Sequence, residues 1–400
     1  MKLCLPRIEI SLSKIQENAR ILCDFYGQKG ISLMGVSKAV LGEPAIARAM
    51  IAGGVQFIAD SRIENIQRMR RAGISAQLVL LRTAPSQAEA VVQSADISLN
   101  TELETIEQLS FYAQAQGKVH QVIIMVELGD LREGVLPCDL VAFVRKTLAL
   151  SHIQITGIGC NLACYGGVKP NHRNMKLLSE LVNIVQSELG IKLAVVSGGN
   201  SANYEWANSG QTIGEINNLR IGESILLGCE TIGRKAIPGL HTHTFQLVAE
   251  VIEAKQKASL PYGEICQDAF GDIPKFKDRG IRQRSIVALG RQDVLTTGLK
   301  SERRLDILGA SSDHLILDSE NCRLQTGDEV NFGLDYGGLL SAMTSPFVGK
   351  EFVCKEFFVG KGSAVDEQRK AVRTNPASTS STSIGPKSIG LKSTGPSLRA

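Results

Sequence analysis

Short apolar segments alternate with longer amphipathic ones through the first half of the 400-residue chain, and this alternation restricts the fold more than any other feature. Eight of the short segments have the composition of strands: residues 31–36, 56–60, 77–81, 96–100, 121–128, 153–159, 193–198 and 219–222. Helical patterns lie between them at residues 43–52, 62–72, 101–116, 139–150 and 171–189. Eight strands in alternation with helices over roughly 200 residues predict an α/β fold, the (β/α)8 TIM barrel.

An open, doubly wound sheet is the alternative for such a pattern. It usually has fewer strands and a glycine-rich first turn, and the segment GVSKAVLG after the first apolar run is no such turn. One further helix precedes the first of the eight strands. Ser13 and Gln16 stand at the spacing of a capping box, which places the beginning of this helix at Ser13.

The pattern changes near residue 236. Runs at residues 244–254, 284–290, 305–310 and 314–318 are short, rich in branched side chains and separated by turn residues with little helix. We therefore predict three parts: a barrel with an N-terminal strand and helix over residues 1–235, a β-rich domain over 236–360, and a tail over 361–400. The tail repeats SIGPK, SIGLK and STGPS, and we expect it to be disordered.

Composition excludes several classes of protein. The formal net charge is +4, and residues 363–400 contain six basic and two acidic residues. The tail therefore accounts for the whole net charge and the rest of the chain is neutral, so no basic surface for nucleic acid is expected there. No apolar run approaches the roughly 20 residues of a membrane span, and no secretory signal is evident, so we expect a cytoplasmic protein without a membrane partner. Nine cysteines without a C-x-x-C pair indicate neither disulfides nor a metal site.

Polar residues follow most of the predicted strands, at the end of a barrel where active sites form. Lys38 follows the first strand, Arg132 the fifth and Asn161 the sixth. The seventh and eighth strands lead into SGGNS (197–201) and RIGES (220–224), which supply glycines and hydroxyls where barrels often bind phosphate. Because a lysine amine forms a Schiff base with an aldehyde, the set indicates pyridoxal 5'-phosphate (PLP), an aldehyde with a phosphate group.

These residues lie in segments that resemble the fold-type III PLP enzymes of the alanine racemase superfamily, and within it the ornithine racemase-like branch. The resemblance extends in order over nearly all of residues 6–358, through RIEISLSKIQENAR, GVSKAV, ADSRIENI, ELGDLREGVLP, GIGCNLACYGG, VSGGNSA, NNLRIGESILLG, ALGRQDV and LGASSDHLILD. It implies a PLP-binding barrel followed by a β domain. It also implies a homodimer with composite active sites.

The resemblance further implies a set of cofactor contacts: Lys38, Arg132, Asn161, Asn200, Ser201, Arg220, Gly222 and Glu223. Lys38 would be the Schiff-base lysine and the catalytic base for one face of the substrate, and Arg132 would hold the phenolate oxygen. Ser201, Gly222 and the backbone of Glu223 would bind phosphate beside Asn200, with Asn161 against the ring. Arg220 would face the pyridine nitrogen, where a permanently protonated donor opposes ring protonation and so favours racemisation.

The chain departs from the family at two positions. Arg291, in GRQD, stands where relatives have the tyrosine that serves the opposite face of the substrate, and arginine is a poor base. Asp313 is our candidate for that catalytic role, with Asp293 and His314 as alternatives and Ser312 beside it as a substrate contact together with Arg291. Gly42 stands where some relatives have a phosphate-binding tyrosine, a role left to Tyr165 or Tyr336.

The predicted function is amino-acid racemisation, with ornithine or another small or cationic amino acid as substrate. Asp60, Glu127, Asp130 and Glu223 are the candidate carboxylates for a cationic side chain. Two alternatives stay open: a non-catalytic PLP carrier or homeostasis protein, and a D-amino-acid aldolase or dehydratase of the same fold.

Overall fold

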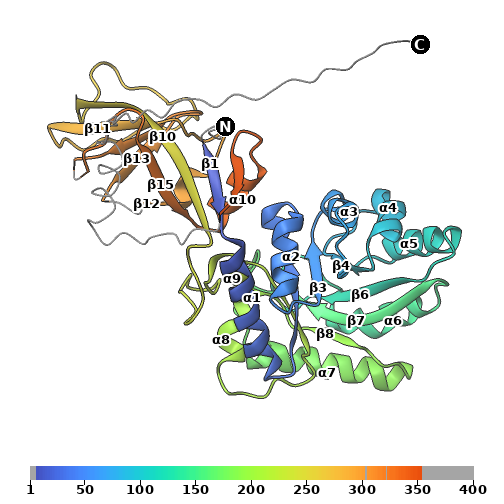
Figure 1. The fold of residues 1–400 in the computed structure, drawn as a ribbon. Coiled ribbons are helices and arrows are strands. Elements are labelled where there is room, and N and C mark those ends of the chain that lie inside the picture. Colours follow the sequence, from blue (N-terminus) through green and yellow to red (C-terminus); the bar gives the residue numbers. More distant parts are fainter. Residues whose placement is uncertain (1–5, 302–303, 321, 354–400) are drawn as a thin grey trace, which may run out of the picture. The chain divides into compact units, whose positions relative to one another are not determined.

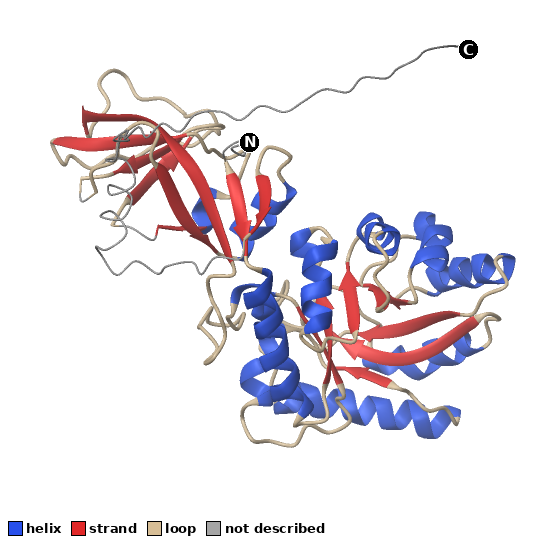
Figure 2. Ribbon diagram, in the orientation of Figure 1, coloured by secondary structure: helices blue, strands red, loops and turns tan. Residues whose placement is uncertain are grey.

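The computed structural model describes residues 6–301, 304–320 and 322–353. The tail that we predict to be disordered, residues 361–400, lies outside the described residues. Figure 1 follows the chain through its elements, and Figure 2 shows the parallel strands of the first half with helices outside them.

Eight parallel strands close into a barrel in their order along the chain, which confirms the TIM-barrel prediction. The strands are β2 (Ser32–Val36), β3 (Phe57–Asp60), β4 (Gln77–Leu80), β5 (Ile97–Asn100), β6 (His120–Val126), β7 (Ile153–Cys160), β8 (Val195–Ser197) and β9 (Asn218–Ile221). Each of them overlaps one of the eight apolar runs. Buried strands of a parallel sheet carry apolar side chains on both faces, which is why the runs are nearly continuous in sequence.

The helices of this part are α1 (Leu12–Gly27), α2 (Pro44–Ala52), α3 (Ile63–Arg71), α4 (Ala88–Ser94), α5 (Leu103–Ala115), α6 (Leu140–Leu148), α7 (His172–Leu189), α8 (Tyr204–Ala207) and α9 (Glu223–Leu227). Alternate residues of the strands fill the barrel, among them Met34, Ala59, Val79, Ile97 and Ile123. The intervening residues pack against the helices in a second, larger apolar cluster. Two separate cores, one inside the barrel and one around it, follow from the alternation of side chains along a strand.

The predicted capping box at Ser13 is wrong. Helix α1 begins at Leu12 after the N-cap residue Ser11, whose side chain makes no capping hydrogen bond. The backbone N–H of Ser11 donates to the carbonyl of Thr244 (2.9 Å), so a distant segment contacts the residue at which the helix begins.

The second half forms an antiparallel sheet with the order β12-β15-β10-β11-β14-β13, as expected for a β-rich domain. Its strands are β10 (Phe245–Ala258), β11 (Ile281–Val287), β12 (Leu299–Ser301), β13 (Asp306–Ala310), β14 (Leu315–Asp318), β15 (Glu329–Leu334) and β16 (Gly349–Phe352), with helix α10 (Tyr336–Thr344) between the last two. The N-terminal strand β1 (Arg7–Ile10) pairs with β10 and β16 and so belongs to this sheet, although the sequence grouped it with the barrel. Strand pairing across more than 230 residues leaves no local signal.

Candidate active site

A cavity of about 650 Å³ opens at the carboxyl ends of the barrel strands. Its walls include all eight side chains or backbone positions for which the resemblance implies contact with PLP: Lys38, Arg132, Asn161, Asn200, Ser201, Arg220, Gly222 and Glu223. These residues come from the ends of five strands, β2, β6, β7, β8 and β9. The closed barrel brings them together although the chain separates them by up to 185 residues, the interval from Lys38 to Glu223.

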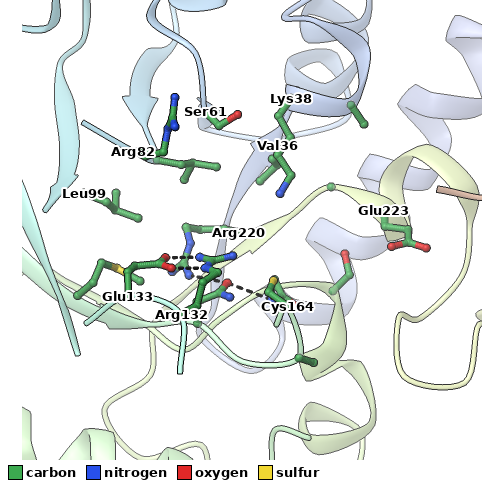
Figure 3. A pocket seen from close by; sticks show the side chains of 18 of the residues that line it. Val36, Lys38, Ser61, Arg82, Leu99, Arg132, Glu133, Cys164, Arg220 and Glu223 are labelled. Carbon is green, nitrogen blue, oxygen red and sulfur yellow. Dashed lines mark hydrogen bonds and ion pairs between the residues drawn. The ribbon is translucent and has the colours of Figure 1, made fainter. Parts of the chain in front are cut away.

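The turn after β2 presents Lys38 to the cavity, and Figure 3 shows its side chain extending toward Arg220 and Arg132. The preceding residue, Ser37, donates its backbone N–H to the Ala59 carbonyl (2.9 Å) and its hydroxyl to Asp60 Oδ2 (2.7 Å). Lys38 then opens a single 3₁₀ turn, Lys38–Val40. Hydrogen bonds to the neighbouring strand therefore fix the backbone from which the lysine projects.

Asp60 does not line the cavity, in contrast to its predicted contact with substrate. It is fully buried, and its two oxygens accept hydrogen bonds from the Ser37 hydroxyl, the Arg62 backbone N–H (3.0 Å) and the Asn65 amide (2.9 Å). Burial raises the pKa of Asp60, while the hydrogen bonds from Ser37 and Asn65 act in the opposite direction. Asp60 organises the turn beneath Lys38.

Arg220 is a buried cation on the barrel wall, 5% exposed. Its Nη1 donates to Ser197 Oγ (2.6 Å), and its Nη2 donates to the Cys160 carbonyl (2.7 Å) and to Asn161 Oδ1 (3.4 Å). These bonds use three of the five guanidinium N–H groups, which leaves donors for another partner. Burial lowers the pKa of Arg220 from its ordinary value.

Two asparagines form the neighbouring wall. The Asn200 amide donates to the Leu162 carbonyl (2.8 Å) and to Asn161 Oδ1 (3.1 Å), and its own oxygen accepts from the Ala202 backbone N–H (2.8 Å). Asn161 Oδ1 thus has two donors, whereas its Nδ2 is buried without a hydrogen-bond partner among the described residues. The network thus leaves a residue of the cavity wall with an unused buried donor.

Three more side chains of the cavity wall carry buried polar atoms without partners in the described part of the chain. With Asn161 they make a set of four: Thr83 Oγ1, Asn100 Oδ1, Asn161 Nδ2 and Thr231 Oγ1. A buried polar group left unpaired costs about 1–3 kcal/mol. Four of them around one cavity indicate that it is built to hold a polar ligand.

Ion pairs hold two further charged residues at the cavity rim. Arg132 pairs with Glu133, as the dashed lines in Figure 3 show, and Glu223 pairs with Arg234. Burial opposes the charge on Arg132, but the contact with Glu133 outweighs it, so the pKa of Arg132 is raised. Ser201 Oγ accepts from the Ser224 backbone N–H (3.2 Å) and joins the turns that follow β8 and β9.

Comparisons with known proteins agree with this geometry. The family model described as "Alanine racemase, N-terminal domain" matches residues 10–229, more than half of the chain. An ornithine racemase from Acetoanaerobium sticklandii is 39% identical over 353 residues, which cover 87% of this chain and 99% of that protein. This chain belongs to the alanine racemase family.

Two further members of the family match over most of their length. A lysine racemase from Thermotoga maritima is 36% identical over 351 residues, covering 87% of this chain and 98% of that protein. The solved structure of an alanine racemase from Streptomyces coelicolor A3(2) superposes with a TM-score of 0.69 at 18% identity, covering 87% of this chain and 98% of that chain. Similarity to curated amino-acid racemases therefore extends over the β domain as well as the barrel.

The residues predicted for the second catalytic role lie apart from the cavity wall. Arg291 and Gln292 donate their backbone N–H groups to the carbonyls of Ser311 and Ser312 (both 3.0 Å), so the GRQD and SSDH segments pack together in the β domain. The Arg291 guanidinium lies over the Phe270 ring, 3.8 Å from its centre. None of Arg291, Ser312 and Asp313 lines the cavity of its own chain.

Asp313 is solvent-exposed and accepts hydrogen bonds from His314 Nδ1 (2.8 Å) and Ser311 Oγ (3.1 Å). The contact with His314 lowers the pKa of Asp313. Its neighbour Asp293 is buried and accepts from the Gly290 backbone N–H (2.8 Å), and burial raises the pKa of Asp293. Asp313 is therefore the accessible carboxylate of this cluster.

Gly42 stands where some relatives have a tyrosine, and the backbone and packing at this position do not accommodate a side chain. Gly42 has a left-handed backbone (φ 59°), and a Cβ built on it would lie 2.8 Å from Asn65 Cβ. Of the two tyrosines considered as replacements, Tyr336 lines the cavity and Tyr165 does not. Burial raises the pKa of Tyr336 to about 12, so its hydroxyl stays protonated and able to donate.

Several residues of the cavity wall escaped the sequence analysis. Arg82 and Glu102 follow β4 and β5, and the rule that polar residues at strand ends line the barrel mouth applies to them as well. Cys164 carries no such signal, because it comes from the long loop between β7 and α7.

The described residues contain neither a cluster of metal ligands nor a membrane-spanning helix. No three His, Cys, Asp or Glu side chains gather there as ligands of a metal ion. None of the helices in that part of the chain combines the length and the apolar composition of a bilayer span.

Proposed function

We propose that this chain is a PLP-dependent racemase of cationic amino acids, with ornithine as the first candidate substrate. The observation that carries the proposal is the cavity that gathers Lys38, Arg220 and Asn161 at one barrel mouth, in a chain similar to an ornithine racemase and a lysine racemase over nearly their whole length. Similarity across the β domain supports an enzyme over a PLP carrier, since the carriers that this superfamily contains lack that domain.

The residues present fit PLP. The cavity wall offers a primary amine, four arginines and unpaired buried donors and acceptors, a set suited to an anionic, oxygen-rich ring compound. Gly222 matches the need for close backbone approach, because a Cβ there would lie 3.1 Å from Val36 Cβ and 3.2 Å from the Val36 carbonyl oxygen. Ser201, Gly222 and Glu223 would hold the phosphate and Lys38 the aldehyde carbon.

Bound PLP would supply an electron-withdrawing ring that stabilises negative charge at the substrate α-carbon. Lys38 would take the α-proton on its own face and return it there. Arg220 would hold the ring nitrogen and stay protonated, which keeps that nitrogen without a proton of its own and favours return of the proton to the α-carbon. Arg132 would hold the phenolate oxygen, fixed in place by its ion pair with Glu133.

Racemisation also requires an acid and base on the opposite face, and we assign this role to Asp313 of a second copy of the chain. Its accessible carboxylate beside His314 is absent from the cavity of its own chain, which fits a homodimer with composite sites. Arg291 and Ser312 of the same cluster would then contact substrate. The cytoplasmic location stays a prediction from the sequence.

The first experiment incubates the purified protein with PLP in deuterated water and follows the α-hydrogens of L-ornithine, L-lysine, L-alanine and L-serine by NMR. We expect exchange with formation of the D-isomer for ornithine and lysine, and loss of both in Lys38→Ala. Tight binding of PLP without exchange of any substrate would instead support a carrier and contradict the proposal.

A mixed-dimer experiment tests the composite site. Lys38→Ala and Asp313→Ala are each expected to be inactive, and co-refolding equal amounts should restore activity in mixed dimers that have one intact site. Random pairing makes half of the dimers mixed, so about a quarter of wild-type activity is expected under the two-fold symmetry of a dimer. An active monomer by light scattering, or mixtures that stay inactive, would exclude the arrangement.

A further inference from the structure

We infer that the end of β5, through the Glu102 carboxylate and the Asn100 side-chain oxygen, binds the distal ammonium of the substrate and selects cationic amino acids. The inference rests on the proposed function and identifies the residues that would determine its specificity. Neither residue was among the candidates that the sequence suggested.

Three of the four carboxylates first considered are occupied by backbone hydrogen bonds and lie outside the cavity wall. Asp60 organises the turn before Lys38, as described above. Asp130 accepts from the backbone N–H groups of Cys164 (3.1 Å) and Tyr165 (3.0 Å), and Glu127 accepts from those of Gly129 and Leu131. These side chains shape loops and do not contact a ligand in the cavity.

Three carboxylates do line the cavity: Glu102, Glu133 and Glu223. Glu133 is neutralised by Arg132, and Glu223 by Arg234. The Glu102 carboxylate forms no ion pair and accepts no hydrogen bond from any described residue, whereas the backbone carbonyl of Glu102 accepts from the Ile106 N–H (3.3 Å). It is therefore the carboxylate of the cavity wall whose charge remains available to a cation.

Glu102 has no evident structural role. It occupies the N-cap position of α5 with an extended backbone (φ −116°, ψ 130°), yet its side chain makes no capping hydrogen bond. Serine, threonine, aspartate and asparagine are the residues that stabilise helices at this position, and glutamate is not among them. A side chain that does not cap and instead lines a cavity points to a ligand.

Asn100, two residues earlier, supplies independent evidence for a donor-rich ligand. It is 4% exposed, and its Nδ2 donates to the Ser98 carbonyl (3.0 Å) and to Ser98 Oγ (2.9 Å). The opposite amide orientation would face its oxygen toward the Ser98 carbonyl, two acceptors in contact, so the observed orientation is required. Asn100 is a residue of the cavity wall, and its Oδ1 is a buried acceptor without a partner among the described residues.

The two groups complement an ammonium. A protonated amine carries three N–H donors and a positive charge, and β5 offers one carboxylate and one amide oxygen. In the closed barrel β5 is four strands from β9 in either direction, so it stands across the mouth from Arg220 and Gly222. The proposed cofactor contacts come from the ends of β2 and of β6 to β9, which leaves the ends of β3, β4 and β5 for the substrate side chain.

The test compares the holoenzyme with Glu102→Gln and with the control Glu104→Gln, which removes the same charge from the first turn of the same helix outside the cavity wall. The readout is the ratio of kcat/KM for L-ornithine to that for L-norleucine, which lacks the distal charge. We expect Glu102→Gln to lower this ratio about tenfold to a hundredfold, mainly through the KM for ornithine, as for a charged hydrogen bond near a solvated rim. Glu104→Gln should leave the ratio unchanged.

Calorimetry with α-methylornithine, which has no α-proton, gives a readout that needs no turnover. Its dissociation constant should rise about tenfold or more in Glu102→Gln and stay unchanged in Glu104→Gln. Equal losses for ornithine and norleucine, or wild-type affinity in Glu102→Gln because Arg82 already neutralises the carboxylate, would overturn the inference. A wild-type enzyme that exchanges no α-hydrogen would refute the proposed function, and the calorimetric comparison would still test Glu102.

Discussion

Asp60 offers the sharpest test of how the lysine turn is built, because alanine and asparagine at this position should differ widely. Alanine removes both acceptor oxygens. The Ser37 hydroxyl can still donate to the Ala59 carbonyl, which lies 3.3 Å away, but the Arg62 backbone N–H and the Asn65 amide lose their acceptor. At about 1–3 kcal/mol for each stranded donor, Asp60→Ala should lower the free energy of unfolding by about 3 kcal/mol.

Asparagine keeps most of the network. Its oxygen can accept from Arg62 and Asn65, and its NH₂ can donate to Ser37 Oγ while that hydroxyl donates to Ala59. The substitution also removes a buried charge whose pKa is raised by desolvation. We expect Asp60→Asn to cost about 1 kcal/mol or less.

Urea denaturation monitored by circular dichroism measures both variants, and absorbance of bound PLP reports on the lysine turn in the same samples. Asp60→Ala should bind PLP more weakly than Asp60→Asn, because the turn that presents Lys38 loses its support. Equal stability losses in the two variants would refute the reasoning, since they would show that the carboxylate charge matters and the hydrogen-bond pattern does not.

Two other predictions concern the cofactor cradle and the pH dependence of stability. Gly222→Ala should raise the dissociation constant for PLP about tenfold or more, because the added methyl group meets Val36 and overpacking costs about 1–3 kcal/mol. Gly27→Ala, at a glycine with no neighbouring atom within 4 Å of the added carbon, is the matched control in the same titration. Burial lowers the pKa of His120 to about 4, below its ordinary 6.5. Between about pH 6.5 and about pH 4 the unfolded chain therefore binds a proton at this residue that the folded chain does not, so the free energy of unfolding falls as the pH drops through this range. His120→Gln should remove up to about 3 kcal/mol of this dependence, and acid unfolding curves of equal slope would contradict the assignment.

The sequence was informative where chemistry depends on position along a strand. Each barrel strand is buried on both faces, so its apolar run is visible without knowledge of its neighbours, and the residue after it stands at the mouth of the barrel. Lys38, Arg132, Asn161 and Arg220 could all be found in this way. Glu102 and Arg82 obey the same rule, since each follows the end of a barrel strand.

Other features depend on contacts that no local pattern contains. The N-terminal strand pairs with β10 and β16, and the N-cap residue of the first helix, Ser11, donates its backbone N–H to the carbonyl of Thr244. Asp60 and Asp130 look like ligand-binding carboxylates in sequence, and only the packing reveals that backbone N–H groups already occupy them.

By itself, the sequence determined the eight-stranded barrel, because hydrophobic periodicity and strand-end chemistry are local properties, and its motifs carried the resemblance to the family. The tertiary structure alone decided which charges are free. Whether a side chain forms an ion pair or a capping bond depends on the direction in which packing holds it, even where the partner is a chain neighbour, as Arg132 is for Glu133. This separates Glu102 from Glu133 and Glu223, three glutamates that look alike in sequence.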